Sequence, residues 1–336
     1  MKQYETDIVV VGAGPVGLFT VFQAGMLKMR CHVVDALEVI GGQCSALYPE
    51  KPIYDIPAYP EISGRNLIES LSKQAEPFNP IYHLNQQVIK VTKNKDGPFD
   101  VVTSKDVLIR SKVVIIAAGC GAFGPNKPPL NDIEKYESSS VFYAVVNPKK
   151  FEGKNVVIAG GGDSAIDWAI ILADIAKNVS IVHRRNKFRC APENSDKLHS
   201  LHNQGKVSIE TPYQLHELGG VGNQLTQVKV VDLDGNVKSI DADILLPFFG
   251  LSMDIGPIVD WGLGIEKKHV EVKASTMETN IRGIYAVGDI ATYEGKLKLI
   301  LTGFSEVAMA CHSAYNIVYP DTPLHFEYST TKGVSK

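Results

Sequence analysis

The sequence predicts an α/β fold made of two dinucleotide-binding domains, with the second domain inserted into the first. Three observations predict it. An apolar strand, a glycine-rich turn and an apolar helix follow one another near the N-terminus, and the same order returns in the middle of the chain. A further apolar strand ends in glycine nearer the C-terminus, where the first domain would resume. The length of 336 residues suits about two domains.

The composition is that of an ordinary globular protein, and it narrows the possible partners. Hydrophobic residues make up 44% of the chain and charged residues 21%, which excludes a mostly disordered chain. With 34 basic and 37 acidic residues, the net charge of -3 provides no general attraction for nucleic acid. We expect no leader peptide and no membrane-spanning segment, and the cysteines do not have the spacing of a zinc site. We therefore expect a cytoplasmic protein with reduced thiols, without a metal site and without a membrane or nucleic acid partner.

The first strand, turn and helix have the pattern of a dinucleotide site. The parts are a strand over 8–11, the GxGxxG turn of Gly12, Gly14 and Gly17, a helix over 18–27, a strand over 32–34, and Asp35. In such a turn the first glycine permits the bend, the second lets the backbone approach a pyrophosphate, and the third lets the helix pack on the sheet. A carboxylate at the position of Asp35 accepts hydrogen bonds from ribose hydroxyls. The alternative is a glycine turn that only joins strand and helix.

The second unit repeats this pattern with a different ending. Its parts are a strand over 156–159, the GxGxxA turn of Gly160, Gly162 and Ala165, a helix over 165–176 and a strand over 179–182. A basic run with Arg184, Arg185 and Arg189 then follows where the first unit has an acid. Guanidinium groups at that position bind a 2'-phosphate, which a carboxylate would repel, so we expect NADPH rather than NADH. The alternative is a solvated basic turn.

Two crossings connect the expected domains. In chain order, the further elements are a strand over 113–118 that ends at Gly119, a strand over 244–246 followed by 247–250, a strand over 283–287 that ends at Gly288 and Asp289, and a helix over 304–318. We expect a first domain over residues 1–118 and 250–336, which would bind one dinucleotide. The inserted domain would cover residues 119–249 and bind the other.

These motifs together resemble those of the thioredoxin reductase-like flavoproteins over almost the whole chain. The motifs are GAGPVG at 12–17, GGQ at 41–43, AAG at 117–119, GGGDSA at 160–165, HRRNKFR at 183–189 and GD at 288–289. The resemblance implies two Rossmann-like domains, with FAD in the first and NADPH in the inserted one. It also implies that Gln43 belongs to the FAD site and that Asp289 accepts a hydrogen bond from the ribityl chain of FAD.

The chain departs from thioredoxin reductases at their redox-active cysteines. Those enzymes carry a CxxC shortly before the strand that opens the NADPH domain, and here the stretch 141–148 reads VFYAVVNP, without a thiol. A dithiol relay needs a thiolate nucleophile and a resolving cysteine, so a relay to thioredoxin is excluded. The chain therefore resembles the thioredoxin reductase-like class of ferredoxin:NADP reductases, which are FAD flavoproteins without the CxxC.

This narrower resemblance implies further contacts with FAD. Tyr48 would stack on one face of the flavin ring, and Tyr328 in the tail would stack on the other, with His325 and Phe326 as alternatives to Tyr328. By position, the further residues of the FAD site are Val88, Phe123 and Thr330. Taken alone, Tyr48 would be an ordinary core or surface tyrosine, so its assignment depends on the resemblance.

The expected function is electron transfer between NADPH and a one-electron carrier, expected to be ferredoxin, through FAD. No side chain is expected to act as a catalytic acid or base, because the flavin carries the chemistry. Ferredoxins are generally acidic, and candidate docking lysines lie at 149–150 and 267–268 and at Lys296 and Lys298. The resemblance also implies a homodimer. The alternatives are a flavoprotein that reduces quinone or oxygen, and a non-catalytic flavin module that senses redox state.

Overall fold

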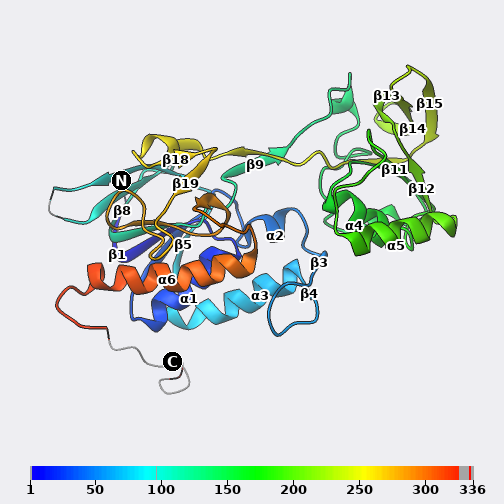
Figure 1. Ribbon diagram of the computed structural model, residues 1–336. Coiled ribbons are helices and arrows are strands. Elements are labelled where there is room, and N and C mark those ends of the chain that lie inside the picture. Colours follow the sequence, from blue (N-terminus) through cyan, green and yellow to red (C-terminus); the bar gives the residue numbers. More distant parts are fainter. Residues whose placement is uncertain (1, 96, 325–332, 334–336) are drawn as a thin grey trace. The chain divides into compact units, whose positions relative to one another are not determined.

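The structure, a computed structural model, describes residues 2–95, 97–324 and 333. The chain forms two compact units (Figure 1). Unit 1 comprises the described residues of Met1–Phe123 and Met253–Lys336, and unit 2 comprises Gly124–Ser252. Unit 2 is thus inserted into unit 1. The predicted α/β fold with two Rossmann-like domains is confirmed, because each unit is built around parallel strands.

Unit 1 is organised around a mixed sheet whose central strands are parallel. The strands are β1 (Lys2–Val11), β2 (Cys31–Val34), β5 (Ile81–His83), β6 (Val88–Lys93), β7 (Phe99–Thr103), β8 (Val107–Ile116) and β20 (Ile284–Ala286). The order is β5-β2-β1-β8, with β20 parallel to the second half of β8. β7 pairs antiparallel with the first half of β8, and β6 lies beyond it. The strand order therefore reverses between β1 and β8.

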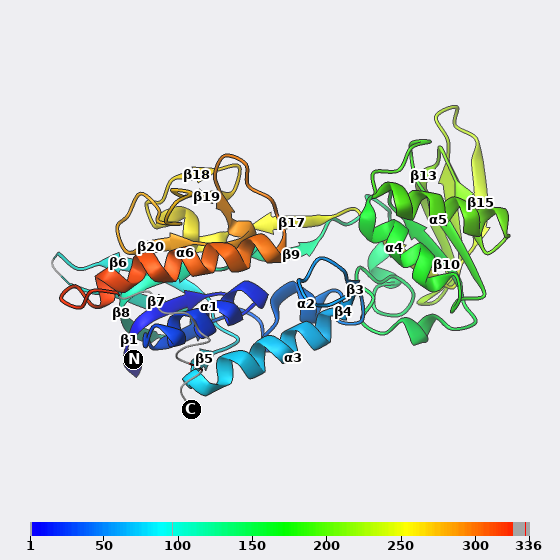
Figure 2. The ribbon, with the colours of Figure 1, turned by 60° about the horizontal axis from the view of Figure 1, so that its bottom comes forward.

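Both faces of this sheet are buried, as the continuous apolar runs of its parallel strands predict. One face carries α1 (Pro15–Met26), α3 (Gly64–Ala75) and α6 (Ile300–Val318), which lie side by side (Figure 2). Ile8 and Val10 of β1 share the core with α1 and α6. Their neighbours Val9 and Val11 point the other way and pack in a second core with Ile258. Alternation along β1 thus fixes both cores.

The remaining elements of unit 1 are short. They are α2 (Gly42–Ala46), β3 (Pro52–Ile53), β4 (Ile62–Ser63), β18 (Ile265–Glu266), β19 (His269–Glu271), β21 (Ala291–Thr292) and the 3₁₀ helices η1 (Glu76–Phe78), η4 (Gly256–Asp260) and η5 (Gly288–Ile290). β3 pairs with β4, and β18, β19 and β21 form a small sheet. β21 follows η5 directly, so this small sheet anchors the chain that leaves β20.

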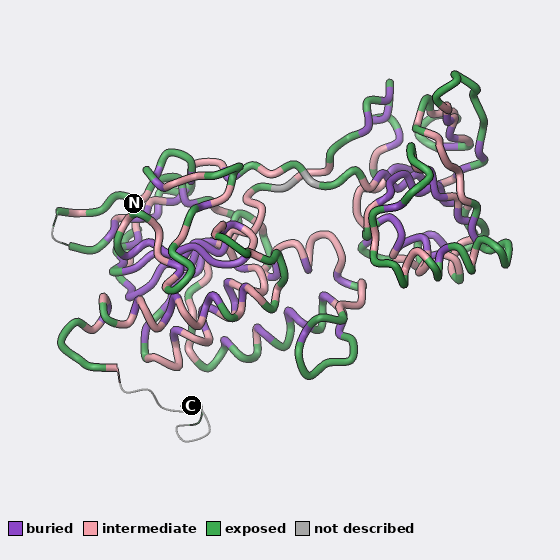
Figure 3. Tube along the Cα trace, in the orientation of Figure 1, coloured by how far each residue is buried: buried purple, intermediate pink, exposed green. Residues whose placement is uncertain are grey.

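Unit 2 repeats the parallel arrangement on a smaller scale. Its elements are β10 (Asn155–Ala159), α4 (Asp163–Leu172), β11 (Asn178–Val182), α5 (Pro192–Asn203), β12 (Val207–Glu210), β13 (Gln214–Val221), β14 (Gln224–Val231), β15 (Val237–Asp241), β16 (Ile244–Pro247), η2 (Ile133–Lys135) and η3 (Pro148–Phe151). The parallel order is β12-β11-β10-β16. Val156 and Ile158 pack under α4 and α5, while Val157 and Ala159 pack against the antiparallel sheet β13-β14-β15. Figure 3 shows the buried residues concentrated in the strands of each unit.

The two chain segments that join the units pair with each other. β9 (Ala122–Pro125) and β17 (Leu251–Asp254) form a two-stranded sheet, and Gly121 bridges to Asp254. Gly121 has a φ of +71°, and a Cβ there would lie 2.2 Å from the carbonyl oxygen of Asp254, so this approach requires glycine. The first segment of unit 1 ends at Phe123 and the second begins at Met253, where the sequence predicted 118 and 250.

Several helix ends differ from the prediction, and α1 covers Pro15–Met26 rather than 18–27. α6 begins at Ile300 rather than Phe304. The sequence did not reveal this start, because the N-cap residue Leu299 has no side chain that can cap a helix. α4 ends at Leu172 rather than Ala176. Among the residues that the structure describes, no helix combines the length and the apolar character needed to cross a membrane.

β2 and β5 are joined by two buried histidines. Nδ1 of His32 lies 3.0 Å from Nε2 of His83, and the ring of Tyr4 packs against both rings. Burial, followed by the charge of His83, lowers the pKa of His32 to about 4. Burial also lowers the pKa of His83. Both rings are therefore neutral near pH 7, and they could not both be protonated without disrupting their contact.

We expect stability to depend on this pair between pH 6.5 and 4. In the unfolded chain a histidine has a pKa of 6.5, and His32 in the folded protein has a pKa of about 4. The unfolded state binds protons first as the pH falls, so the stabilisation is complete above pH 6.5 and about 3 kcal/mol is lost towards pH 4. Urea unfolding across this range measures it. His83→Gln should reduce the pH dependence, whereas His216→Gln, at an exposed histidine, should not; equal slopes for the two variants would contradict this account.

Candidate functional site

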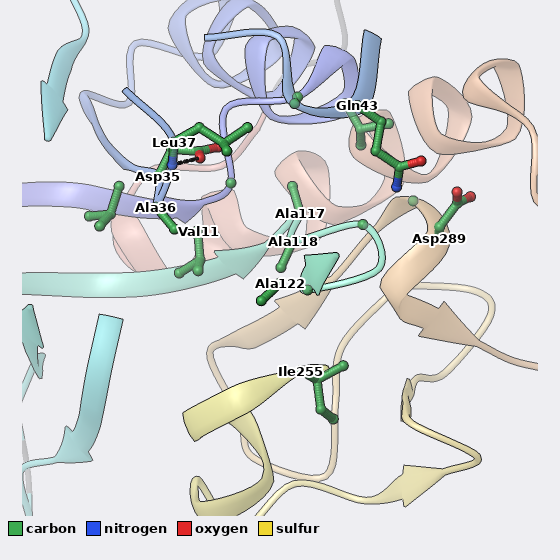
Figure 4. A pocket seen from close by; sticks show the side chains of 18 of the residues that line it. Val11, Asp35, Ala36, Leu37, Gln43, Ala117, Ala118, Ala122, Ile255 and Asp289 are labelled. Atoms are coloured by element: carbon green, nitrogen blue, oxygen red, sulfur yellow. Dashed lines mark hydrogen bonds between the residues drawn. The ribbon is translucent and has the colours of Figure 1, made fainter. Parts of the chain in front are cut away.

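A cavity of about 310 Å³ opens at the carboxyl ends of the parallel strands of unit 1 (Figure 4). The residues at these strand ends that line it are Val11, Val34, Ala117 and Val287. Open α/β sheets bind ligands at this edge, beside the point where the strand order reverses. Asp35 follows β2 and Asp289 follows β20, and β1 and β8 lie between these strands. Three strand spacings, about 14 Å, therefore separate the two strand ends, which suits an extended ligand.

The first glycine turn forms one wall of the cavity. Gly12 has a φ of +110°, and a Cβ there would lie 2.4 Å from the carbonyl oxygen of Ala117. A Cβ at Gly17 would lie 2.0 Å from the carbonyl oxygen of Gly12. Gly14 is different, because the nearest atom to a Cβ there is Cα of Gly42 at 4.0 Å, and both of these glycines line the cavity. Gly12 and Gly17 thus serve the turn itself, and Gly14 leaves space for a ligand.

The turn leads directly into the N-terminus of α1. The N-cap residue Gly14 has no side chain to cap the helix, Pro15 follows it, and the first turn contains no acidic residue. The first N–H groups of the helix are therefore left without a side-chain acceptor, and the helix dipole places partial positive charge there. This end of α1 can bind an anion such as a pyrophosphate.

Asp35 is held rigidly at one end of the cavity. Its Oδ2 accepts a hydrogen bond from the N–H of Ala13 at 2.5 Å. Its Oδ1 accepts one from the N–H of Leu37 at 2.8 Å, which Figure 4 shows. Burial raises the pKa of Asp35, while the two N–H groups act in the opposite direction. Each oxygen keeps a further lone pair, so the carboxyl group can accept ribose hydroxyls as predicted.

Gln43 and Asp289 lie at the other end of the cavity (Figure 4). The side chain of Gln43 hydrogen-bonds to the thiol of Cys120, and the charge of Asp289 also reaches this thiol, so both groups converge on one point. Burial, more than the charge of Asp289, raises the pKa of Cys120. This end therefore offers an amide and a carboxylate to a polar part of a ligand.

Tyr48 lies in the cavity wall beside a buried thiol. Its hydroxyl accepts a hydrogen bond from Sγ of Cys44 at 3.6 Å. Burial raises the pKa of both groups above their ordinary values, so both stay protonated. Cys44 is thus a packing residue rather than a reactive thiolate.

Sequence reasoning missed several residues of this cavity. The additional lining residues include Leu37, Ile255, Trp261, Leu299 and Ile300. Ile300 is the first residue of α6, so a second uncapped helix N-terminus opens here. The indole N–H of Trp261 is buried and has no partner among the described residues. None of these positions belongs to a short motif, and only the fold brings them to the strand ends.

The glycine turn of unit 2 has the same construction. Gly160 donates its N–H to the carbonyl oxygen of Val182 at 3.0 Å, and a Cβ on it would lie 2.7 Å from the carbonyl oxygen of Phe248. α4 then begins at its N-cap Gly162 without a side-chain cap. Ala165 is buried under the turn. The second predicted turn therefore meets the backbone requirements of a pyrophosphate site.

The basic run lies against this turn. The N–H of Arg189 donates to the carbonyl oxygen of Gly161 at 2.7 Å, and the ring of His183 occupies the space beside that glycine. Burial, and then the charges of Arg184, Arg185 and Arg189, lower the pKa of His183. The three guanidinium groups are exposed, and no carboxylate within the described ranges forms an ion pair with them. They are available to bind a phosphate.

The structure thus brings most of the predicted residues together. The predicted residues that line the cavity of unit 1 are Gly12, Gly14, Asp35, Gln43, Tyr48, Val88 and Asp289, with Gly17 directly behind the turn. The predicted residues at the turn of unit 2 are Gly160, Gly162, Ala165, Arg184, Arg185 and Arg189. The positions outside the described part of the structure are His325, Phe326, Tyr328 and Thr330, together with the side chain of Phe123. Their roles remain predictions.

Two glycine-turn units, one inserted into the other, define an α/β protein with two dinucleotide-binding folds. A family profile described as pyridine nucleotide-disulphide oxidoreductase matches residues 6–315. The chain belongs to this pyridine nucleotide-disulphide oxidoreductase family.

Similar proteins agree with this assignment. The ferredoxin–NADP reductase of Rickettsia conorii is 60% identical over 333 residues, which cover 99% of this chain and 98% of the relative. The protein of the same name from Rickettsia typhi is 57% identical over 329 residues, covering 98% of each chain. Among solved structures, the thioredoxin reductase of T. acidophilum superposes with a TM-score of 0.80 at 24% identity, over 93% of this chain and 98% of that one. The last likeness concerns the fold alone.

The two kinds of glycine in the first turn should respond differently to substitution. Gly14→Ala places a methyl group in open cavity space, so the apoprotein should keep its stability while FAD, used as the probe, binds about tenfold more weakly or worse. Gly17→Ala forces a methyl group into the turn and should lower the free energy of unfolding by about 1–3 kcal/mol. Fluorescence titration and urea unfolding of the apoproteins measure the two effects. Unchanged FAD binding by Gly14→Ala would argue against a ligand site beside Gly14.

Proposed function

We propose that the protein is an FAD-dependent reductase that transfers electrons between NADPH and ferredoxin. The observation that carries this proposal is the full-length likeness to ferredoxin–NADP reductases at 57–60% identity. The two dinucleotide folds are consistent with it, because one can hold FAD and the other NADPH.

The residues of unit 1 fit FAD. Gly14 and Gly42 both line the cavity, and their backbones are in contact, because a Cβ at Gly42 would lie only 3.0 Å from Cα of Gly14. A side chain at Gly42 would push these two segments of the cavity wall apart. The N-terminus of α1 would hold the pyrophosphate, Asp35 the ribose and Asp289 the ribityl chain. When bound, FAD supplies the conversion between a hydride from NADPH and single electrons for the carrier. The protein positions these groups and provides no acid or base.

Disulfide chemistry of the thioredoxin reductase kind is not available to this chain. The sequence has five cysteines, all within the described residues and all free, and no two of them form a CxxC. Cys190 is the only cysteine in the sequence of unit 2. Burial raises the pKa of Cys44, Cys120 and Cys190, which opposes the thiolate form that exchange needs. Electrons must therefore leave the flavin directly for an external acceptor.

The candidate docking lysines are not equivalent. Lys296 is wrongly placed among them, because its side chain is only 6% exposed and forms an ion pair with the buried Glu306. Lys298 remains at the surface, where its Nζ lies 2.8 Å from Nε2 of His269, next to Lys267 and Lys268. We keep these three lysines, with 149–150 of unit 2, as candidates for an acidic ferredoxin. A homodimer and a cytoplasmic location are further parts of the proposal.

The arginines of unit 2 should determine the preference for NADPH. At limiting NADPH concentration, Arg184→Ala and Arg189→Ala should each reduce the rate of flavin reduction about 10- to 100-fold. Each substitution removes a charge-assisted contact with the 2'-phosphate. Reduction by NADH should hardly change. Stopped-flow absorbance measures both rates, and Lys177→Ala removes an exposed charge of the same unit as the control. Equal decreases in the rate of flavin reduction with NADPH and with NADH would refute a role of these arginines in recognising the 2'-phosphate.

The acceptor is tested by competition. With NADPH as donor, cytochrome c reduction should depend on added ferredoxin and should exceed the turnover supported by quinone or oxygen alone. Raising the ionic strength should slow the ferredoxin reaction, because docking is electrostatic. Faster turnover with quinone or oxygen than with ferredoxin would favour a flavoprotein that reduces quinone or oxygen. A protein that binds FAD but is not reduced by NADPH would be a redox-sensing module instead.

A further inference from the structure

An ion pair between the fully buried Glu306 and the largely buried Lys296 lies behind the Asp289 end of the cavity. Glu306 of α6 is 0% exposed, and its Oε1 pairs with the ammonium group of Lys296. The same oxygen accepts a hydrogen bond from the hydroxyl of Tyr293 at 2.6 Å. Burial and this hydrogen bond raise the pKa of Tyr293, so the hydroxyl remains a donor. We name Tyr293, Lys296 and Glu306 the Glu306 cluster.

The cluster is tied to the backbone of the site. Oε2 of Glu306 accepts a hydrogen bond from the N–H of Gly288 at 2.7 Å. Gly288 has a φ of +74° and begins η5, and the next residue is the half-buried Asp289, whose side chain lines the cavity. Because Glu306 fixes the residue before Asp289, it controls the direction from which that carboxylate enters the cavity.

A close approach of three elements makes this contact possible. A Cβ at Gly303 of α6 would lie 3.4 Å from Cα of Gly288 and 2.5 Å from a methyl group of Val16 in α1. Gly303 therefore lets α6, η5 and α1 meet at the edge of the cavity. One helical turn later Glu306 reaches the N–H of Gly288. The cluster thus links the second turn of α6 to the start of η5, beside the cavity.

Stability alone does not account for a charged pair at this place. Bringing two charges out of water costs about as much as their attraction returns, and an apolar pair is often as stable. An electrostatic role is more specific. The charge of Asp289 already reaches Cys44, Tyr48 and Cys120 across the cavity. A second carboxylate without a partner directly behind Gly288 would add to this negative field, and Lys296 cancels it.

We propose that the Glu306 cluster is a positioning and charge-balancing device for the flavin site: Glu306 orients Asp289 through the N–H of Gly288, and Lys296 neutralises Glu306. The inference rests on the proposed binding of FAD in this cavity. Tyr293, Lys296 and Glu306 are positioning residues, because they act through Gly288 and Asp289. The cluster would set both the affinity for FAD and the midpoint potential of the bound flavin.

The charges of the pair should act with opposite signs. Lys296→Met leaves a lone buried carboxylate, so it should weaken FAD binding by about tenfold or more and lower the midpoint potential. Glu306→Gln keeps an acceptor for the N–H of Gly288 but leaves Lys296 unpaired, so it should raise the potential. The double variant should return close to the wild-type potential. Glu294→Gln, at an exposed acid in the same loop, is the control and should change neither quantity.

The measurements are fluorescence titration of each apoprotein with FAD, redox titration of each bound flavin and thermal unfolding of each apoprotein. If Lys296→Met does not fold, Tyr293→Phe tests the same direction of change in the midpoint potential, because it removes a hydrogen-bond donor to Glu306. It should lower the potential by a smaller amount than Lys296→Met. Variants that lose stability but keep the wild-type affinity and potential would overturn the proposal and reduce the cluster to a structural one. A wild-type apoprotein that binds no FAD would contradict the proposed function itself, which is a separate outcome.

Discussion

The parallel pairing of β1 with both β2 and β8 is the constraint on which the rest of unit 1 depends. Residues of β1 pair in register with Cys31–Val34 on one side and with β8 on the other. Because the three strands run in one direction, their carboxyl ends meet at one edge of the sheet, and the chain must leave each end by a different route. The cavity is the space between these departing segments. Gly12 is required because the turn passes within contact of Ala117, directly after β8, and Gly17 is required because α1 packs against the carbonyl oxygen of Gly12.

Unit 2 uses the same backbone solution and a different charge. In both units a glycine turn follows the first strand and an uncapped helix begins at the turn. The units differ at the end of the second strand, where unit 1 has a buried carboxyl group and unit 2 has three exposed guanidinium groups. A 2'-phosphate is repelled by the first and attracted by the second. Under the proposed function, this difference would direct FAD to unit 1 and NADPH to unit 2, although both ligands contain an ADP group.

Buried charge around the cavity is compensated in two ways. Asp35 is satisfied by two backbone N–H groups, and Glu306 by Lys296, Tyr293 and the N–H of Gly288. The nearby thiol of Cys44 and the hydroxyl of Tyr48 stay neutral because burial raises their pKa values. The site is therefore rigid and carries little uncompensated charge apart from Asp289. This compensation is consistent with the proposed function, in which the bound cofactor and not a side chain carries the chemistry.

Features that depend on neighbouring residues could be predicted from the sequence: the two strand, turn and helix units, the glycines at 12, 14 and 160, the acid at 35, the basic run, and the missing CxxC. These follow from local backbone geometry and residue chemistry, which a short motif records. Other features became visible only in the folded protein: α6 begins at the cavity, Trp261 and Ile255 line it, and the side chain of Lys296 is buried against Glu306 rather than exposed. Burial and pairing of this kind depend on strand order and on contacts between distant segments, which no local pattern encodes.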